Sequence, residues 1–183
     1  MSETVQLENR GAVAIMTLNR PESMNAMNPE MLDTMFRVAR QAADDPAIRC
    51  LVITGNGRAF SAGGDVKAMA SGNADGSRSG PMVSRVDVLR QQEEVSRLLA
   101  EMPKPTICAV NGVAAGAGLS VALAADLRVA SDQSRYTTAF AKVGFSGDFG
   151  GTWLLQRLVG PLKAKELYFL SDVIDANKAL ELG

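Results

Sequence analysis

The sequence predicts an α/β fold in which strands and helices alternate along the chain. Apolar runs of strand length occupy residues 50–54 and 106–110, a glycine-rich turn follows each run, and each turn opens a helical pattern. Further amphipathic helical patterns lie between these units. Because a strand, a helix and a second strand normally form a right-handed crossover, the repeated unit favours parallel strands.

A hairpin and a capped helix open the chain. Residues 5–9 and 12–18 have strand patterns and meet at Gly11, which predicts the hairpin. Asn28 suits a helix N-cap and Pro29 suits the first helical position, and an apolar stripe continues to a stop at residues 45–46. This helix returns the chain to the strand at residues 50–54.

The remaining elements continue the alternation. Residues 71–81 combine glycines with Ser, Asn and Asp, which predicts a mobile loop. A long amphipathic helix is expected over residues 82–102, because two prolines, Pro103 and Pro105, end it. The elements expected after the second glycine-rich turn are a helix at 119–125, short strands at 126–130 and 135–138, and helices at 150–159 and 161–170.

Composition limits the kinds of partner. The 183 residues fit a single domain over residues 1–183, and 19 basic against 20 acidic residues give a net charge of −1 with no long run of either sign. Nucleic acid is therefore not an expected partner. No apolar run approaches the roughly 20 residues of a membrane span, and the N-terminus lacks a targeting pattern, so neither a membrane partner nor export is expected.

Cysteine and histidine usage narrows the chemistry. Cys50 and Cys108 fall within apolar strands, where a thiol acts as a small buried hydrophobe, and this suits the cytoplasm. The sequence has no histidine. Ser-His and Cys-His nucleophiles and zinc sites of the usual type are thereby excluded, and no metal is expected. Proton transfer falls to a carboxylate, Lys, Tyr, Cys or water.

The two glycine-rich turns, at residues 60–65 and 111–118, predict one site built from two backbone segments. A helix N-terminus presents unpaired N–H donors and the positive end of its dipole, and glycine allows a ligand to approach those donors closely. Such a site favours negative charge that develops on an oxygen atom.

Four motifs together resemble the crotonase family, the enoyl-CoA hydratase and isomerase group. They lie at residues 19–28, 60–67, 109–125 and 144–160. The resemblance implies a crotonase-like spiral of strand-turn-helix (ββα) units and an acyl-CoA substrate, with coenzyme A as part of the thioester and no permanently bound cofactor. It also implies a homo-oligomer, a trimer or hexamer. Family members continue beyond Gly183 into C-terminal helices, so we expect this part of the family fold to be absent.

The resemblance also implies roles for particular residues. The N–H groups of Gly64 and Ala117 would donate to the thioester oxygen. The family often has glycine where Ala117 stands, and an alanine serves there only if it is helical, because it has poor access to positive φ. The positions implied to line the path of coenzyme A are Met24, Ala26, Ala62, Gly64, Asp65, Val66 and Lys67.

Two departures from the hydratase pattern favour an isomerase. Family hydratases resemble this chain except at two catalytic glutamates, and the matching positions hold Ser120 and Phe140. One carboxylate, Asp148, matches an aspartate of family isomerases, including the ring-oxepin isomerase of phenylacetate breakdown. A 1,3-shift of a double bond needs one acid/base, which removes a proton from the α or γ carbon and returns it at the other, so Asp148 is the expected catalytic group.

Several alternatives remain open. Hydration of a 2-enoyl-CoA and binding of acyl-CoA without catalysis are the competing functions. The 4-chlorobenzoyl-CoA dehalogenases also resemble the Asp148 segment, but they rely on a histidine and a tryptophan that this chain lacks at the matching positions. Among local interpretations, Asp65 and Asp148 both suit helix N-caps, and Trp153 is expected in the core.

Overall fold

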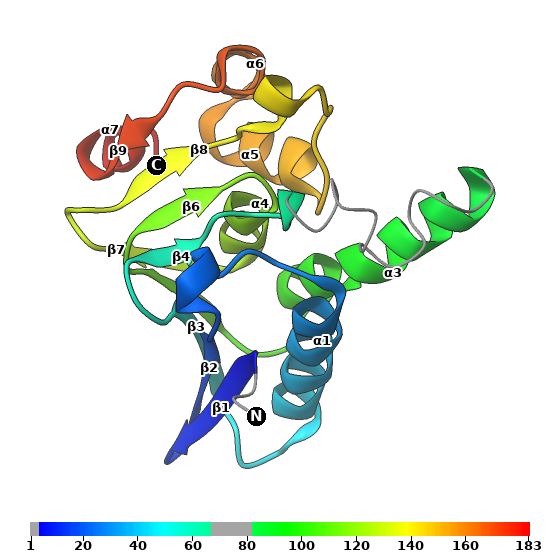
Figure 1. The fold of residues 1–183 in the computed structure, drawn as a ribbon. Helices are drawn as coiled ribbons and strands as arrows, with labels where there is room; N and C mark the ends of the chain where they lie inside the picture. Colours follow the sequence, from blue (N-terminus) through cyan, green and yellow to red (C-terminus); the bar gives the residue numbers. More distant parts are fainter. Residues whose placement is uncertain (1–3, 67–81) are drawn as a thin grey trace.

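Two sheets built from alternating strands form the frame of the computed structural model, which describes residues 4–66 and 82–183 (Figure 1). The larger sheet has the order β1-β2-β3-β5-β7 and the smaller one the order β4-β6-β8-β9. Their strands are β1 Val5–Arg10, β2 Val13–Leu18, β3 Cys50–Gly55, β4 Ala59–Ser61, β5 Thr106–Val110, β6 Val113–Ala115, β7 Leu127–Ala130, β8 Arg135–Thr137 and β9 Ile174–Asp175. β1 and β9 pair antiparallel with their neighbours, and all other pairs are parallel.

The helices follow the strands in a repeating order. They are α1 Pro29–Asp44, α3 Met82–Ala100, α4 Ala117–Ala124, α5 Gly151–Val159, α6 Pro161–Leu170 and α7 Ala176–Glu181, with short 3₁₀ turns at η1 Pro21–Ser23 and η2 Phe140–Val143. The successive strand pairs β3–β4, β5–β6 and β7–β8 each place one strand in the larger sheet and the next in the smaller sheet, and a helix follows each pair. The chain is therefore a spiral of ββα units, as expected for a crotonase fold.

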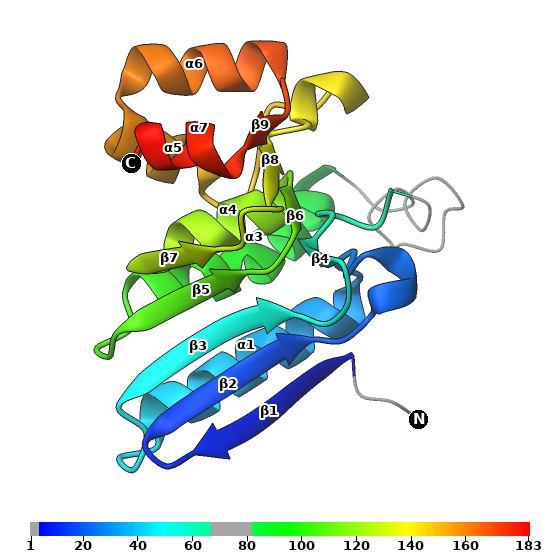
Figure 2. The same ribbon diagram turned by 90° about the vertical axis from the view of Figure 1, so that its left-hand side faces the viewer.

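The helix spacing read from the sequence matches the packing of α1. Asn28 caps this helix, because its Oδ1 atom accepts a hydrogen bond of 2.9 Å from the Met31 N–H. Met31, Met35 and Val38 lie on one buried face of α1, against the interior of the larger sheet. Figure 2 shows α1 and α3 along this sheet, while α5, α6 and α7 gather at the end of the molecule away from β1. This packing excludes water from the frame that carries the turns.

Most expected elements are present within one or two residues. The glycine-rich turns, however, contain the short strands β4 and β6, which pair with each other. Trp153 was expected in the core and this expectation is wrong, because 54% of the residue is exposed and Arg157 lies over its ring at 4.5 Å. Cys108 is fully buried, whereas Cys50 is partly exposed. The loop predicted over residues 71–81 lies outside the described residues.

Candidate active site

The two glycine-rich turns lie side by side, because the strands β4 and β6 that overlap them pair in parallel. Gly63 has φ +90°, and a Cβ atom there would lie 2.6 Å from the Ala115 carbonyl oxygen. Gly118 packs equally closely, since its Cβ would lie 2.6 Å from the Ser61 carbonyl oxygen. The absence of side chains at these two glycines therefore lets the turns meet through their backbones.

The backbone of Ala117 lies at this junction, next to Gly63. The ideal Cβ position of Gly63 lies 3.3 Å from the Ala117 nitrogen, so the two turns touch at this amide. Ala117 is the first residue of α4 and is helical, while Gly116 before it adopts the positive φ of 51°. The first N–H groups of a helix have no intrahelical acceptor. An alanine can serve at this position only if it is helical, and Ala117 is helical.

Gly64 occupies a short parallel bridge to Met27. The two bonds of this bridge run from the Met27 N–H to the Gly63 carbonyl, 2.7 Å, and from the Asp65 N–H to the Met27 carbonyl, 3.1 Å. Neither bond uses the Gly64 N–H. The Gly64 N–H is therefore left outside this bridge.

The residues implied to line the coenzyme A path surround the same turn. The Ala62 N–H donates to the Met24 carbonyl at 2.9 Å. The Arg20 guanidinium donates to the Ala26 carbonyl and forms an ion pair of 3.1 Å with Asp65. Together these three contacts hold the segment after η1 against the first turn.

Two of the residues implied to line the coenzyme A path are exposed or lie outside the described residues. Val66 is 53% exposed, and Lys67 lies outside the described residues. Asp65 forms an ion pair with Arg20, and the residues after Val66, which a cap at Asp65 would serve, lie outside the described part of the chain. The cap interpretation of Asp65 therefore stays a prediction.

Asp148 sits in a tight loop between η2 and α5. Gly147, Phe149 and Gly150 all have positive φ, at 108°, 51° and 71°. Gly150 is the N-cap residue of α5, and no side chain makes a cap hydrogen bond there. The interpretation of Asp148 as a side-chain N-cap is therefore wrong. The helix instead begins after a backbone turn, with Gly150 as its N-cap residue.

The surroundings of Asp148 favour its protonated form. Its Oδ1 atom is buried and has no hydrogen-bond partner among the described residues. Burial, and secondly the neighbouring Glu93 carboxylate, raise the pKa of Asp148 from 3.8 to about 6. A carboxyl group with such a pKa can both accept and donate a proton near neutral pH.

An aromatic pair connects the Asp148 loop with the second turn. Phe140 is buried and stacks on Tyr168 with ring centroids 6.0 Å apart and an interplanar angle of 7°. A Cβ at Gly116 would lie 3.9 Å from the Phe140 ring, and one at Gly147 would lie 2.8 Å from the Tyr168 ring. The Phe140 and Tyr168 rings thus form a continuous apolar wall between the two segments.

Ser120 takes part in polar contacts near the Tyr168 hydroxyl. Its hydroxyl lies 3.3 Å from the Gly116 carbonyl oxygen, to which it donates. A Cβ at Gly151 would fall 2.2 Å from the Ser120 Oγ atom and 2.5 Å from the Tyr168 hydroxyl. Burial and the Asp148 charge raise the pKa of Tyr168 to about 12, although the Ser120 hydroxyl opposes the shift, so the phenol stays protonated at neutral pH.

Two neighbours of Asp148 were missed by sequence reasoning. Tyr168 lies in α6, where the sequence shows only a helical segment, and Glu93 lies in α3 within an amphipathic pattern. The Glu93 carboxylate accepts a 2.9 Å hydrogen bond from the Phe149 N–H, across 56 positions of sequence. A local sequence pattern does not predict a contact between residues so far apart in the chain.

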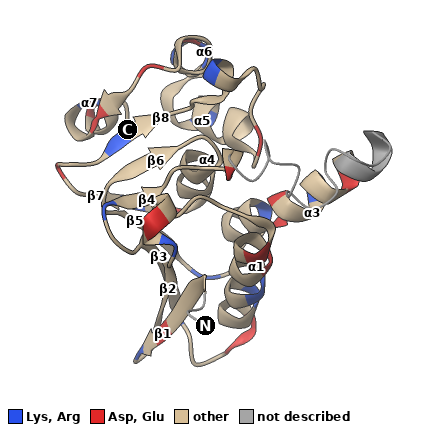
Figure 3. Cartoon of the chain, in the orientation of Figure 1, with Lys and Arg blue, Asp and Glu red and all other residues tan. Residues whose placement is uncertain are grey.

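Neither a candidate metal cluster nor a candidate membrane-spanning helix occurs in the described ranges. No cluster of three or more His, Cys, Asp or Glu side chains that could hold a metal ion occurs within residues 4–66 and 82–183. None of the helices in these ranges is long and apolar enough to cross a membrane. Figure 3 shows acidic and basic positions interspersed along α1 and α3.

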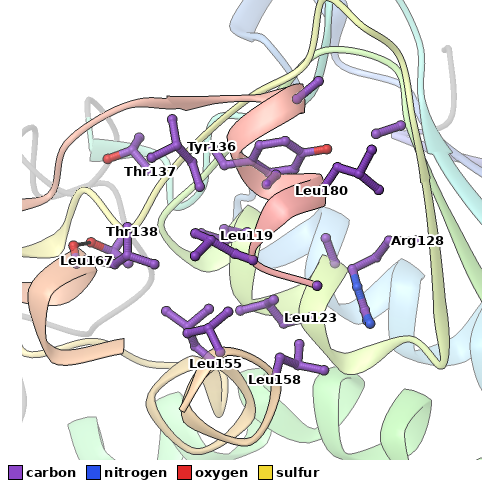
Figure 4. A pocket seen from close by; sticks show the side chains of 18 of the residues that line it. Leu119, Leu123, Arg128, Tyr136, Thr137, Thr138, Leu155, Leu158, Leu167 and Leu180 are labelled. Atoms are coloured by element: carbon purple, nitrogen blue, oxygen red, sulfur yellow. Dashed lines mark hydrogen bonds between the residues drawn. The ribbon is translucent and has the colours of Figure 1, made fainter. Parts of the chain in front are cut away.

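A separate apolar cavity of about 510 Å³ lies among α4, α5 and α7 (Figure 4). Leu119 and Leu123 of α4 face Leu155 of α5 and Leu180 of α7 across it. The lining includes neither turn amide nor Asp148. This cavity and the candidate catalytic groups are therefore different places in the described part of the chain.

Comparison with known proteins identifies the family. The enoyl-CoA hydratase/isomerase family model matches residues 8–183. The chain belongs to this family. It is 40% identical to the 1,2-epoxyphenylacetyl-CoA isomerase of Escherichia coli K12, over all of this chain and 68% of that protein. It is 36% identical to the crotonyl-CoA hydratase of Syntrophomonas wolfei, over 99% of this chain and 67% of that protein.

Solved structures agree with the family fold. The crystal structure of an enoyl-CoA hydratase from Polaromonas sp. JS666 superposes with a TM-score of 0.88 at 34% identity, covering 98% of this chain and 68% of the other. The chain thus spans about two thirds of the length of these family members. Membership implies CoA-thioester substrates, and the relatives include both isomerases and hydratases.

Proposed function

We propose that this chain shifts a carbon–carbon double bond in an acyl-CoA thioester, from the 3-enoyl to the 2-enoyl position. The observation that carries the proposal is Asp148, a carboxyl group with a buried oxygen and a pKa raised to about 6. Ser120 and Phe140 occupy the positions of the two hydratase glutamates, and a phenylalanine cannot transfer a proton. Among the positions that match catalytic residues of the family, Asp148 is the acid/base that remains, and a 1,3-shift requires one.

The proposed reaction has two proton transfers at one carboxyl group. The Asp148 carboxylate removes a proton from C2 of the 3-enoyl thioester, and negative charge moves onto the thioester oxygen as a dienolate forms. The Gly64 and Ala117 N–H groups stabilise that oxygen by hydrogen bonds. The protonated Asp148 then returns the proton at C4, which leaves the double bond at C2–C3 and the carboxylate restored.

The need to hold two backbone N–H donors in place explains why both turns are rich in glycine. Removing one donor of such a pair typically costs about 3 to 4 kcal/mol of transition-state stabilisation. Close backbone contact at Gly63 and Gly118 fixes the two turns relative to each other, so the donors need little reorganisation when charge develops. The aromatic wall of Phe140 and Tyr168 limits water near the dienolate, which suits isomerisation more than hydration.

Coenzyme A would enter along the first turn. We assign its contacts to Met24, Ala26 and Ala62, together with Gly64, Asp65, Val66 and Lys67. The fastening of Ala26 and Asp65 by Arg20 supports this assignment, because it holds the segment against the turn before a ligand arrives. A trimeric or hexameric assembly is part of the same proposal and rests on the family resemblance.

Hydration is the second candidate. The Syntrophomonas relative is named a hydratase, and its similarity to this chain is nearly as extensive as that of the isomerase. The residues at positions 120 and 140 argue against it. A hydratase needs a water-activating base as well as a proton donor. Beside Asp148 the described site offers two protonated hydroxyl groups and the Glu93 carboxylate, which accepts the Phe149 N–H.

Product analysis tests the proposal. The chain and its Asp148→Asn variant are incubated separately with 3-enoyl-CoA and 2-enoyl-CoA, and the products are followed by mass and ultraviolet absorbance. We expect conjugation of the 3-enoyl substrate without a change of mass, lost in the variant. A gain of one water by the 2-enoyl substrate would indicate the hydratase. Bound thioester without conversion would indicate a binding protein.

A further inference from the structure

The loop that carries Asp148 is held from outside by one long-range side-chain hydrogen bond. The Glu93 Oε1 atom, on α3, accepts the Phe149 N–H at 2.9 Å. Phe149 directly follows Asp148, and its side chain is buried in the main core. The position of the Asp148 backbone is therefore fixed by the Phe149 ring in the core and by Glu93 at its amide.

This loop needs such support because its backbone is strained. Phe149 has φ 51°, in the left-handed region that is unfavourable for a residue other than glycine. Gly147 and Gly150 on either side also have positive φ but tolerate it. A non-glycine residue persists in this conformation only when its surroundings hold it there, and the Glu93 hydrogen bond is one of the contacts that do so.

We propose that Glu93 is a positioning residue for Asp148: its carboxylate holds the strained loop through the Phe149 N–H and places a second carboxylate beside the acid/base. The inference rests on the proposed function, since it treats Asp148 as the group that moves the proton. Glu93 itself is not required to touch the substrate. It acts through the place and the ionisation of Asp148.

The electrostatic part follows from the groups around Asp148. In the described part of the chain, α3 contributes Glu93, α6 contributes the protonated Tyr168 phenol, and α4 contributes the Ser120 hydroxyl near that phenol. A negative neighbour disfavours the charged form of a carboxyl group and so raises its pKa. Glu93 is the charged group that acts on Asp148 in this direction, and burial is the larger cause.

Two substitutions separate the hydrogen bond from the charge. Glu93→Gln keeps a carbonyl oxygen that can accept the Phe149 N–H, but it removes the charge. Glu93→Leu removes both. Glu94→Gln is the matched control, because Glu94 is the adjacent acid of α3 and its carboxylate pairs with Arg97 at 2.6 Å on the surface.

The test combines a measurement that needs no turnover with one that does. Carbon-13 NMR follows the titration of the Asp148 side-chain carboxyl group, and amide hydrogen exchange reports on the Phe149 N–H. For Glu93→Gln we expect a lower Asp148 pKa, an isomerisation profile whose rising limb moves to lower pH, and a Phe149 amide as protected as in the wild type. For Glu93→Leu we expect faster exchange at Phe149 and a lower kcat. Glu94→Gln should match the wild type.

An unchanged Asp148 titration in Glu93→Gln would overturn the electrostatic role, and unchanged Phe149 exchange with unchanged kcat in Glu93→Leu would overturn the positioning role. Failure of the proposed function looks different. In that case Asp148→Asn would retain isomerase activity, or the wild type would convert no 3-enoyl-CoA, while the Asp148 carboxyl titration would still respond to Glu93→Gln.

Discussion

Replacing Asp148 by asparagine should stabilise the folded chain at neutral pH. The substitution removes an ionisable group with almost no change of volume. Asp148 does not cap α5, because Gly150 is the N-cap and no side chain makes a cap bond. Its Oδ1 atom also has no hydrogen-bond partner among the described residues. The variant therefore measures the cost of the buried charge rather than the loss of a contact.

The expected size follows from the pKa. Burial, with Glu93 as a smaller cause, raises the pKa of Asp148 from 3.8 to about 6. Each pKa unit corresponds to about 1.4 kcal/mol, so the charged carboxylate destabilises the fold by up to about 3 kcal/mol. The folded chain holds the proton more tightly than the unfolded chain does. Its free energy of unfolding therefore falls as pH rises from 3.8 to about 6. Above this interval the whole of that stability is lost.

Urea unfolding at a series of pH values measures this effect. We expect Asp148→Asn to exceed the wild type in free energy of unfolding by up to about 3 kcal/mol at pH 7 and by nothing below about pH 4. Asp33→Asn, on the exposed face of α1, controls for the change of net charge. A difference that is independent of pH, or a variant less stable than the wild type at pH 7, would refute the reasoning.

Three further predictions concern the junction of the turns and the core. Gly118→Ala places a Cβ 2.6 Å from the Ser61 carbonyl oxygen, and we expect a loss of about 1 to 3 kcal/mol in urea unfolding together with lower turnover. Cys108 is fully buried and its pKa is raised to about 12, so a thiol reagent should label it, by mass spectrometry, only after unfolding. Arg20→Met removes the ion pair to Asp65, and we expect a higher KM for acyl-CoA with kcat little changed in steady-state kinetics.

Local signals in the sequence predicted much of the fold. The Asn28 cap and the apolar stripe that follows it predicted α1, and the proline at the start of α6 lies at the first helical position. The spiral arrangement came from the family resemblance, because local patterns do not show that β4 and β6 leave the larger sheet and pair with each other.

The candidate site was predictable only in part, for the same reason. The glycine-rich turns and Asp148 stand out as motifs, whereas Glu93 and Tyr168 reach Asp148 through contacts between segments far apart in the chain. Trp153 shows a different limit. An aromatic residue in an amphipathic helix usually predicts burial, but this ring lies beneath Arg157 on the surface of α5. Residue type alone did not indicate which face of the helix it would occupy.

Transfer of deuterium within the substrate tests most directly whether one carboxyl group performs both proton transfers. A 3-enoyl-CoA deuterated at C2 is converted by the chain in ordinary water, and the position of the label in the 2-enoyl product is determined by mass spectrometry and NMR. The account predicts deuterium at C4 in a substantial fraction of the product, because Asp148 is buried and returns the proton that it removed. Product without any deuterium at C4, even at the earliest times, would contradict a single shielded acid/base.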